Sequence, residues 1–177
     1  MMISLLLLLL FTDPILNYDF GSFKSGSNWL VINDGVMGGR SVGNAFLSDN
    51  RIHFEGAISF ANNGGFASLR SNRLQLDLSE AKTIEIRYRL EGLDFALMLE
   101  QYNQFYRPYF SYPLNKTEGQ WVTKIISIEQ LYETRMGDYT GKFFDKKKSK
   151  PFRRLGFISK EKKESNFTLE IDYISIN

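Results

Sequence analysis

The sequence contains no cysteine and only one histidine, His53. The absence of cysteine excludes disulfide bonds, thiolate nucleophiles and cysteine-ligated zinc. A serine–histidine–acid triad would have to use His53, which alternates with Ile52 and Phe54 and is expected to face away from them. A metal site would need carboxylates almost alone, and the sequence has no Asp-x-Asp-x-Asp-Gly loop. We therefore expect no catalytic residue, no metal site and no cofactor.

The apolar N-terminus is too short to cross a bilayer. Residues 3–11 include six consecutive leucines, whereas a membrane-spanning helix needs about twenty apolar residues. The run suits the apolar part of an export signal, but no Lys or Arg precedes it and no small-x-small cleavage site follows. Export, a first strand and an incorrectly assigned start codon all stay open. We treat residues 1–15 as a separate segment and residues 16–177 as the folded domain, and the cellular compartment stays undetermined.

Size and charge suit one domain with a locally basic surface. The 177 residues, 43% hydrophobic and 15% aromatic, suffice for a sizeable core. The net charge of +2 hides an uneven distribution, because residues 142–163 carry ten Lys and Arg against two acids. This run is typical of a solvated loop, and the alternative is docking on acidic protein or anionic lipid. It lacks a stacking pattern for single strands, so no nucleic-acid partner is expected.

Short alternating runs predict an all-β sandwich. The clearest alternation spans residues 82–90, where Ile84, Ile86, Tyr88 and Leu90 share one face. Other strands are expected at residues 16–20, 29–32 (a short buried strand), 42–47, 51–60, 65–70, 94–100, 120–128, 154–159 and 166–176. A phase change in the last run predicts a bulge near Tyr173. One short helix is expected at residues 128–134, followed by a Gly- and Lys-rich loop over 135–151. About ten strands and almost no helix favour a sandwich over a βαβ sheet.

Two turn-rich clusters stand on either side of the hairpin predicted at residues 42–60. Residues 33–41 and 62–66 each place Asn or Asp before glycines, where positive φ is tolerated. Arg70 is a candidate to reach the Asp34 carboxylate and lock the two loops together. Val36 and Met37 either plug the end of the sandwich or form a contact patch. The candidate binding residues are Trp29, Asn33, Asp34, Gly35, Val36, Met37, Gly38, Gly39, Ser41, Asn62, Asn63, Gly64, Gly65, Phe66 and Arg70.

The residue sequence of these clusters resembles that of one protein family. The pattern Trp29…Asn33-Asp34-Gly35-Val36-Met37-Gly38-Gly39-Arg40-Ser41, followed by Asn62-Asn63-Gly64-Gly65-Phe66-Ala67-Ser68-Leu69-Arg70, is similar to the domain of complex I intermediate-associated protein 30, an assembly factor for respiratory NADH:ubiquinone oxidoreductase. The resemblance covers residues 18–176 and is weakest over 93–152. It implies a single-domain, galactose-binding-like jelly-roll sandwich. It also implies a binding or chaperone role in complex I assembly, without catalysis.

Other motifs carry no chemistry. Gly39-Arg40-Ser41-Val42-Gly43 matches a nucleophile-elbow string, but a strand follows where that turn needs a helix. The glycines spell neither a dinucleotide fingerprint nor a P-loop. The acids Asp34, Glu55 and Glu100 show no spacing that selects a glycosidase pair. These strings are therefore interpreted as chance matches or as loop structure.

The expected function is non-catalytic binding of another protein, such as a respiratory-complex subunit or an assembly intermediate. Membrane contact would come through that partner or through the N-terminus. The alternative is a jelly-roll carbohydrate-binding module. That alternative is favoured by the aromatic tract Tyr102, Phe105, Tyr106, Tyr109, Phe110 and Tyr112, which could be a stacking platform on a sheet face. Alternation is expected to bury about half of this tract in the core.

Overall fold

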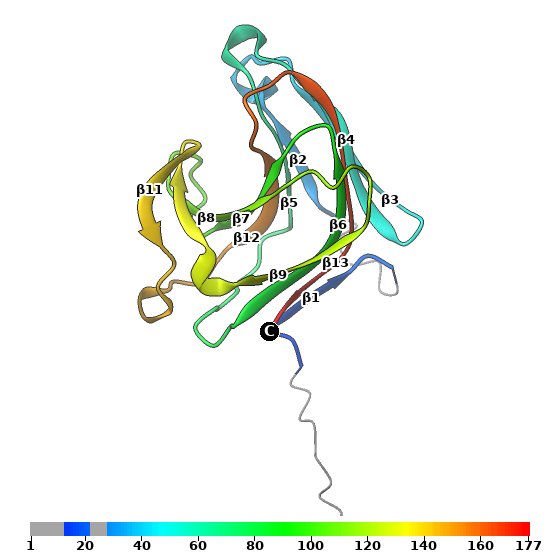
Figure 1. The fold of residues 1–177 in the computed structure, drawn as a ribbon. Helices are drawn as coiled ribbons and strands as arrows, with labels where there is room; N and C mark the ends of the chain where they lie inside the picture. Colours follow the sequence, from blue (N-terminus) through cyan, green and yellow to red (C-terminus); the bar gives the residue numbers. More distant parts are fainter. Residues whose placement is uncertain (1–12, 22–27) are drawn as a thin grey trace, which may run out of the picture.

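Two antiparallel sheets pack face to face in the computed structural model, which describes residues 13–21 and 28–177 apart from the side chains of Val36 and Met37. The six-stranded sheet contains β1 (Leu16–Asp19), β3 (Val42–Ser48), β4 (Arg51–Ile58), β6 (Thr83–Glu91), β9 (Val122–Ser127) and β13 (Ser165–Ile176). The seven-stranded sheet contains β2 (Leu30–Asn33), β5 (Ala67–Arg70), β7 (Phe95–Glu100), β8 (Tyr109–Leu114), β10 (Tyr132–Arg135), β11 (Asp138–Phe143) and β12 (Arg154–Ser159). The predicted all-β sandwich is confirmed (Figure 1).

The six-stranded sheet is centred on β13. Its order is β3-β4-β13-β6-β9, with β1 also paired to β13. The alternation predicted for β6 is confirmed, since Ile84, Ile86, Tyr88 and Leu90 are buried. The expected bulge is also present, because the register against β6 shifts between Ile171 and Tyr173.

The seven-stranded sheet has the order β11-β10-β8-β7-β12-β5-β2. Aromatic side chains from both sheets fill the space between the layers, among them the mutually contacting rings of Phe54, Phe95 and Phe167. Trp29 joins this core beside Phe157, with ring centroids 5.9 Å apart. The prediction of a buried strand after Trp29 is wrong. β2 is an edge strand, and Leu30 on it is 45% exposed.

The predicted helix at residues 128–134 is wrong. Only Ile128–Gln130 form a 3-10 turn, η3, closed by a capping box between Ser127 and Gln130. The chain then enters β10, where Tyr132 and Thr134 pair with β8. Turn chemistry and β-favouring residues prevail over the short helical pattern at this point. The loop predicted over 135–151 is wrong in part as well, because its first half forms β11.

Three other 3-10 turns lie in the described part of the chain: η1 (Asp34–Met37), η2 (Ala61–Asn63) and η4 (Lys146–Lys148). η1 and η2 belong to the two glycine-rich clusters, and η4 to the basic run. The N-terminal apolar run falls in residues 1–12, outside the described residues. Among the residues that are described, no helix is long and apolar enough to span a membrane.

Candidate functional site

The two glycine-rich clusters meet at the carboxylate of Asp34, which is 2% exposed. Ser41 donates to this carboxylate from its backbone N–H at 2.9 Å and from its hydroxyl at 2.5 Å. Gly65 and Phe66 of the second cluster donate their backbone N–H groups at 2.5 and 3.2 Å. Burial alone would raise the pKa of Asp34, but these hydrogen bonds outweigh it and lower the pKa. The two clusters are therefore fastened to each other by one ionised side chain.

Close approach explains the glycines around this carboxylate. A Cβ at Gly39 would lie 2.3 Å from the Asp34 carboxyl carbon, and one at Gly64 would lie 2.5 Å from an Asp34 oxygen. Gly38 has a left-handed φ of +89° and ends η1. Asn62 donates to the Gly38 carbonyl at 3.1 Å and so adds a second link between the clusters. The sequence predicts that these corners lie together, and the structure gives the geometric reason.

The remaining predicted site residues differ in their surroundings. Gly35 is exposed within η1. Asn33 is half-buried, and its side-chain oxygen makes no hydrogen bond within the described part of the chain. Asn63 is exposed with a left-handed φ of +58°. The prediction for Val36 and Met37, plug or contact patch, concerns side chains outside the described residues.

Contrary to the prediction, Arg70 does not reach the Asp34 carboxylate. It lies on β5 and its Nη1 pairs with Oε1 of Glu100 on β7 at 2.8 Å. The Asp34 oxygens are already taken by backbone and hydroxyl donors, and β5 points Arg70 to the opposite face from the core residue Leu69. Arg70 therefore belongs to the outer face of the seven-stranded sheet and not to the contacts between the two loops.

That outer face is concave and unusually shielded. Figure 1 shows the sheet curling so that β11 rises on one side and the end of the molecule that holds η2 rises on the other. Met98 at the centre of β7 is 1% exposed, although it lies outside the hydrophobic core between the sheets. Ser111 on β8 and Thr134 on β10 are 2% and 5% exposed, and their hydroxyls lie 2.7 Å apart. Side chains that point away from the core are thus largely withdrawn from solvent.

Charged groups cluster on this face. The register places Arg154 of β12 opposite Glu100, so two guanidinium groups stand beside one carboxylate. Both side chains of the Arg70–Glu100 pair are only 13% exposed. Burial raises the pKa of Glu100 despite the attraction of the two arginines, and lowers that of Arg70 despite the attraction of Glu100. The Nε of Arg154 is buried and has no hydrogen-bond acceptor among the described residues.

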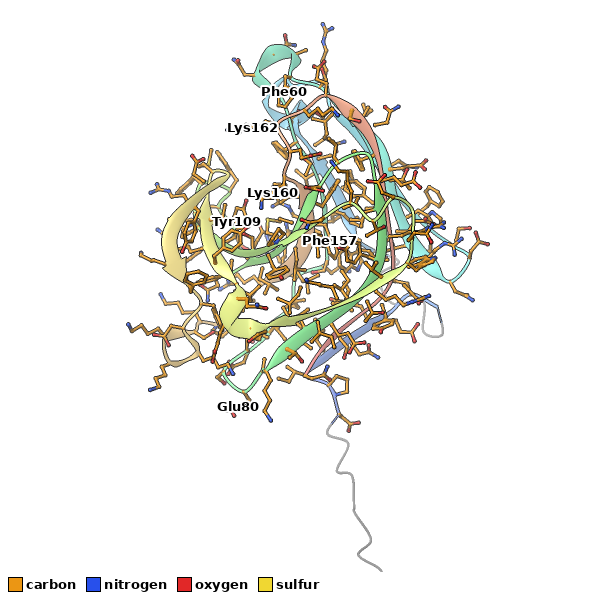
Figure 2. All side chains as sticks on the ribbon, viewed as in Figure 1. Phe60, Glu80, Tyr109, Phe157, Lys160 and Lys162 are labelled. Atoms are coloured by element: carbon orange, nitrogen blue, oxygen red, sulfur yellow. The ribbon has the colours of Figure 1, made fainter. Side chains whose placement is uncertain are left out.

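Tyrosines extend the site toward β11. Burial, with smaller contributions from Tyr132 and Glu100, outweighs the opposing charge of Arg70 and raises the pKa of Tyr109 to about 12. Tyr132 and Tyr139 make an edge contact with centroids 5.4 Å apart, and Phe143 continues this row. The ammonium of Lys160 lies 3.3 Å from the Tyr132 hydroxyl. Figure 2 labels Tyr109 and Lys160 on the side of the sheet that faces away from Phe157 in the core.

Most of this face was not predicted from the sequence. Of the binding residues predicted from the sequence, Arg70 alone lies among the charged groups of the concave face. One signal was available: residues 95–99 form an unbroken apolar run, which is typical of a strand buried on both faces. Of the aromatic tract, Tyr109 faces the concavity, Phe110 packs on the core, and Phe105 lies exposed in the β7–β8 loop.

The outer face of the six-stranded sheet carries a second charged cluster. Glu170 on β13 is 4% exposed and pairs with Arg51, His53 and Arg89. Burial alone would raise the pKa of Glu170, but the hydrogen bond and charge of Arg89, with smaller contributions from the other two neighbours, outweigh burial and lower that pKa. His53 faces away from the core, as predicted from its alternation with Ile52. Over residues 13–21 and 28–177, no group of three or more His, Asp or Glu side chains is arranged to hold a metal ion.

Comparison with solved structures establishes the fold class. The family 11 carbohydrate-binding module from Clostridium thermocellum, solved with a β-1,3-1,4-mixed-linked tetrasaccharide, aligns at a TM-score of 0.59 and 12% identity, over 90% of this chain and 94% of that one. The same family's module from cellulase Lic26A-Cel5E of that organism aligns at 0.60 and 12%, over 92% and 95%. A family 29 carbohydrate-binding module aligns at 0.50 and 12%, over 85% and 78%. The galactose-binding-like jelly-roll prediction is confirmed, and at these identities the likeness concerns the fold alone.

Sequence comparison identifies the family. No curated protein matches the chain. A family model for complex I intermediate-associated protein 30 (CIA30) matches residues 18–171. The match includes both clusters that Asp34 fastens together, so the residues that carried the resemblance are also those that hold the loops in place. The chain belongs to the complex I intermediate-associated protein 30 family.

Proposed function

We propose that this protein is a non-catalytic binding module whose partner is another protein, and that the partner docks on the concave face of the seven-stranded sheet. The observation that carries the proposal is the set of shielded side chains on that face, above all the Arg70–Glu100 pair beside Tyr109. The core does not need these groups, because they point away from it. The family supports a partner among the subunits or assembly intermediates of NADH:ubiquinone oxidoreductase.

The composition of the face supports a protein partner. Tryptophan, tyrosine and arginine are enriched among the residues that contribute most of the binding energy at protein interfaces. Arg70 and Tyr109 meet this description, and the exposed rings of Tyr139 and Phe143 add apolar area at the border. The predicted rim of glycine-rich loops is part of the same proposal. Its role is to hold the η2 end rigid beside the sheet, since binding costs less when a surface is preorganised.

The absence of catalysis is part of the proposal. The Ser41 hydroxyl donates to Asp34, and His53 lies on the outer face of the other sheet, bonded to Glu170. A nucleophile and a base within hydrogen-bond reach are the minimum for acyl transfer, and these two groups have other partners. His53→Ala is therefore expected to leave partner binding unchanged.

Site-specific photo-cross-linking in the native cells tests the proposal. A benzoylphenylalanine in place of Tyr139, which is 51% exposed beside the concave face, should give discrete adducts with complex I subunits or assembly intermediates. The control position is Glu80, which is exposed at the end of the molecule far from Tyr109 (Figure 2). Failure to obtain adducts from position 139, or identical adducts from both positions, would refute the proposal.

Carbohydrate binding is the second candidate. It is favoured by three aromatic side chains along one border of the concave face, Tyr132, Tyr139 and Phe143, and by the fold shared with carbohydrate-binding modules. Calorimetric titration with the mixed-linked β-1,3-1,4 tetrasaccharide and with neutral β-glucans at millimolar concentration decides the matter. Saturable binding that Tyr139→Ala abolishes would favour a saccharide ligand. No heat of binding leaves the protein-binding proposal standing.

A further inference from the structure

We infer that the concave face takes an acidic segment of a protein partner, with partner carboxylates held separately at Arg154 and at Lys160, which lie at opposite ends of β12, and an apolar partner side chain held against Tyr139 and Phe143. This inference rests on the proposed protein-binding function and names the chemistry of the partner. Nothing in the family description specifies it.

The strands place an excess of positive charge on this face. The register assigns Arg70, Arg154 and Glu100 to it, so two cations share one anion. Lys160 directly follows β12 and adds a third cation beside Tyr132. Lys160 is exposed, but Arg70 and Arg154 are partly buried, so water screens their charges less than it screens charges on an open surface. An acidic group therefore gains more here than at the exposed lysines of η4.

Arg154 has an unused donor on this face. The Glu100 Oε1 atom is taken by Arg70 at 2.8 Å, and the buried Nε of Arg154 has no acceptor within the described residues. The Arg154 side chain as a whole is only half-buried, and no hydrogen bond from its guanidinium is made within the described residues, so a partner carboxylate would supply a missing acceptor. Hydrogen bonds between a guanidinium and a carboxylate are among the stronger ones in proteins. The position of this donor thus points to an acidic group as the ligand.

The aromatic rings favour a peptide over a sugar chain. Tyr132 and Tyr139 meet at an interplanar angle of 82°, and Tyr139 and Phe143 at 63°. Rings set so steeply to each other leave no common plane for consecutive sugar rings to stack on. An aromatic side chain of the partner can extend this row through a further edge-to-face contact. Tyr139 and Phe143 are 51% and 62% exposed, so the partner would cover an apolar border next to the cationic floor.

Fluorescence anisotropy with two labelled peptides tests the inference. The first is a soluble peptide of Glu-Leu pairs separated by Ser, and the second has Gln in place of every Glu. We expect the acidic peptide to bind about tenfold or more tightly than its Gln counterpart, the ratio for one charged hydrogen bond. Arg154→Gln and Lys160→Gln should each weaken binding of the acidic peptide by about tenfold. Because Lys160 is exposed, its variant keeps the test valid should Arg154→Gln unfold the protein.

A matched charge control separates site binding from general attraction. Lys148→Gln removes the same charge from η4, where the Lys148 side chain is 85% exposed, and should change affinity less than about twofold. Equal affinity for the two peptides, or an equal loss in Lys148→Gln, overturns the inference. Binding of labelled oligogalacturonate under conditions in which the labelled acidic peptide does not bind also overturns the inference, in favour of an acidic saccharide. If cross-linking at position 139 gives adducts while the protein binds both peptides with equal affinity, the proposed protein-binding function stands and only the inference of an acidic partner segment is refuted.

Discussion

Replacing Asp34 by alanine should destabilise the protein more than removal of almost any other single carboxylate. The change deletes the acceptor of four hydrogen bonds, two from Ser41 and one each from the backbone N–H groups of Gly65 and Phe66. The Ser41 hydroxyl keeps a partner in the Ser59 carbonyl at 3.2 Å. The three backbone donors lose theirs, in a place where Asp34 itself is 2% exposed.

The magnitude follows from these contacts. Hydrogen bonds to a charged group contribute about 1.5–3 kcal/mol each, and a buried donor left unpaired costs about 1–3 kcal/mol. Because bonds to one carboxylate are not additive, we expect a total loss of about 3–5 kcal/mol. For a chain of this length the loss corresponds to a fall in Tm of roughly 8–15 °C. Asp34→Asn keeps one acceptor oxygen and should lose about 2–3 kcal/mol.

Urea unfolding followed by circular dichroism, with linear extrapolation, measures the loss. Glu80→Ala is the control, because it removes an exposed acid and should change stability by less than about 0.5 kcal/mol. If Asp34→Ala unfolds at the same urea concentration as Glu80→Ala, the carboxylate does not fasten the two clusters. The structural explanation of the glycine-rich motif would then have to be abandoned.

Three further predictions concern the same loops, the core and acid stability. Gly64→Ala should lower the free energy of unfolding by about 2–3 kcal/mol, because the added Cβ crowds Asp34 even though the φ of Gly64 is −72°. Gly38→Ala should lower it by about 1–2 kcal/mol, because the φ of Gly38 is +89° although no atom lies within 4 Å of the added Cβ. Melting curves equal to that of the wild type for both variants would contradict both predictions. Trp29→Ala should lower the free energy of unfolding by about 3–5 kcal/mol, because the indole packs among core rings. Trp29→Phe should lower it clearly less, because a ring is kept and the indole Nε1 has no acceptor within the described residues. An unchanged urea midpoint for Trp29→Ala would disprove the packing. Because the pKa of Asp34 is lower in the folded protein than the unfolded value of 3.8, the ionised carboxylate stabilises the fold above pH 3.8. The difference in free energy of unfolding between wild type and Asp34→Asn should therefore narrow as the pH falls below 3.8. A constant difference in pH-dependent unfolding would argue against an ionised Asp34.

The aromatic core and most strands could be predicted from the sequence because they follow from local periodicity. The alternation of β6 and the phase change in β13 each depend on neighbouring residues alone. β10 and β11 could not be predicted in this way. A weak helical pattern from Ile128 precedes them and a Gly- and Lys-rich composition runs through and beyond them. Their strand conformation depends on pairing, because β10 pairs with β8 and β11 pairs with β10.

Turn chemistry and alternation are local properties, so the residues alone suffice to identify an all-β CIA30-family domain with two glycine-rich corners. Which side chains meet was decided only by the tertiary structure. Arg70 pairs with Glu100, thirty positions away, because β12 lies between β5 and β7 and brings their outward-facing residues within reach. No spacing in the chain reveals that arrangement, because the order of strands in a sheet depends on long-range packing.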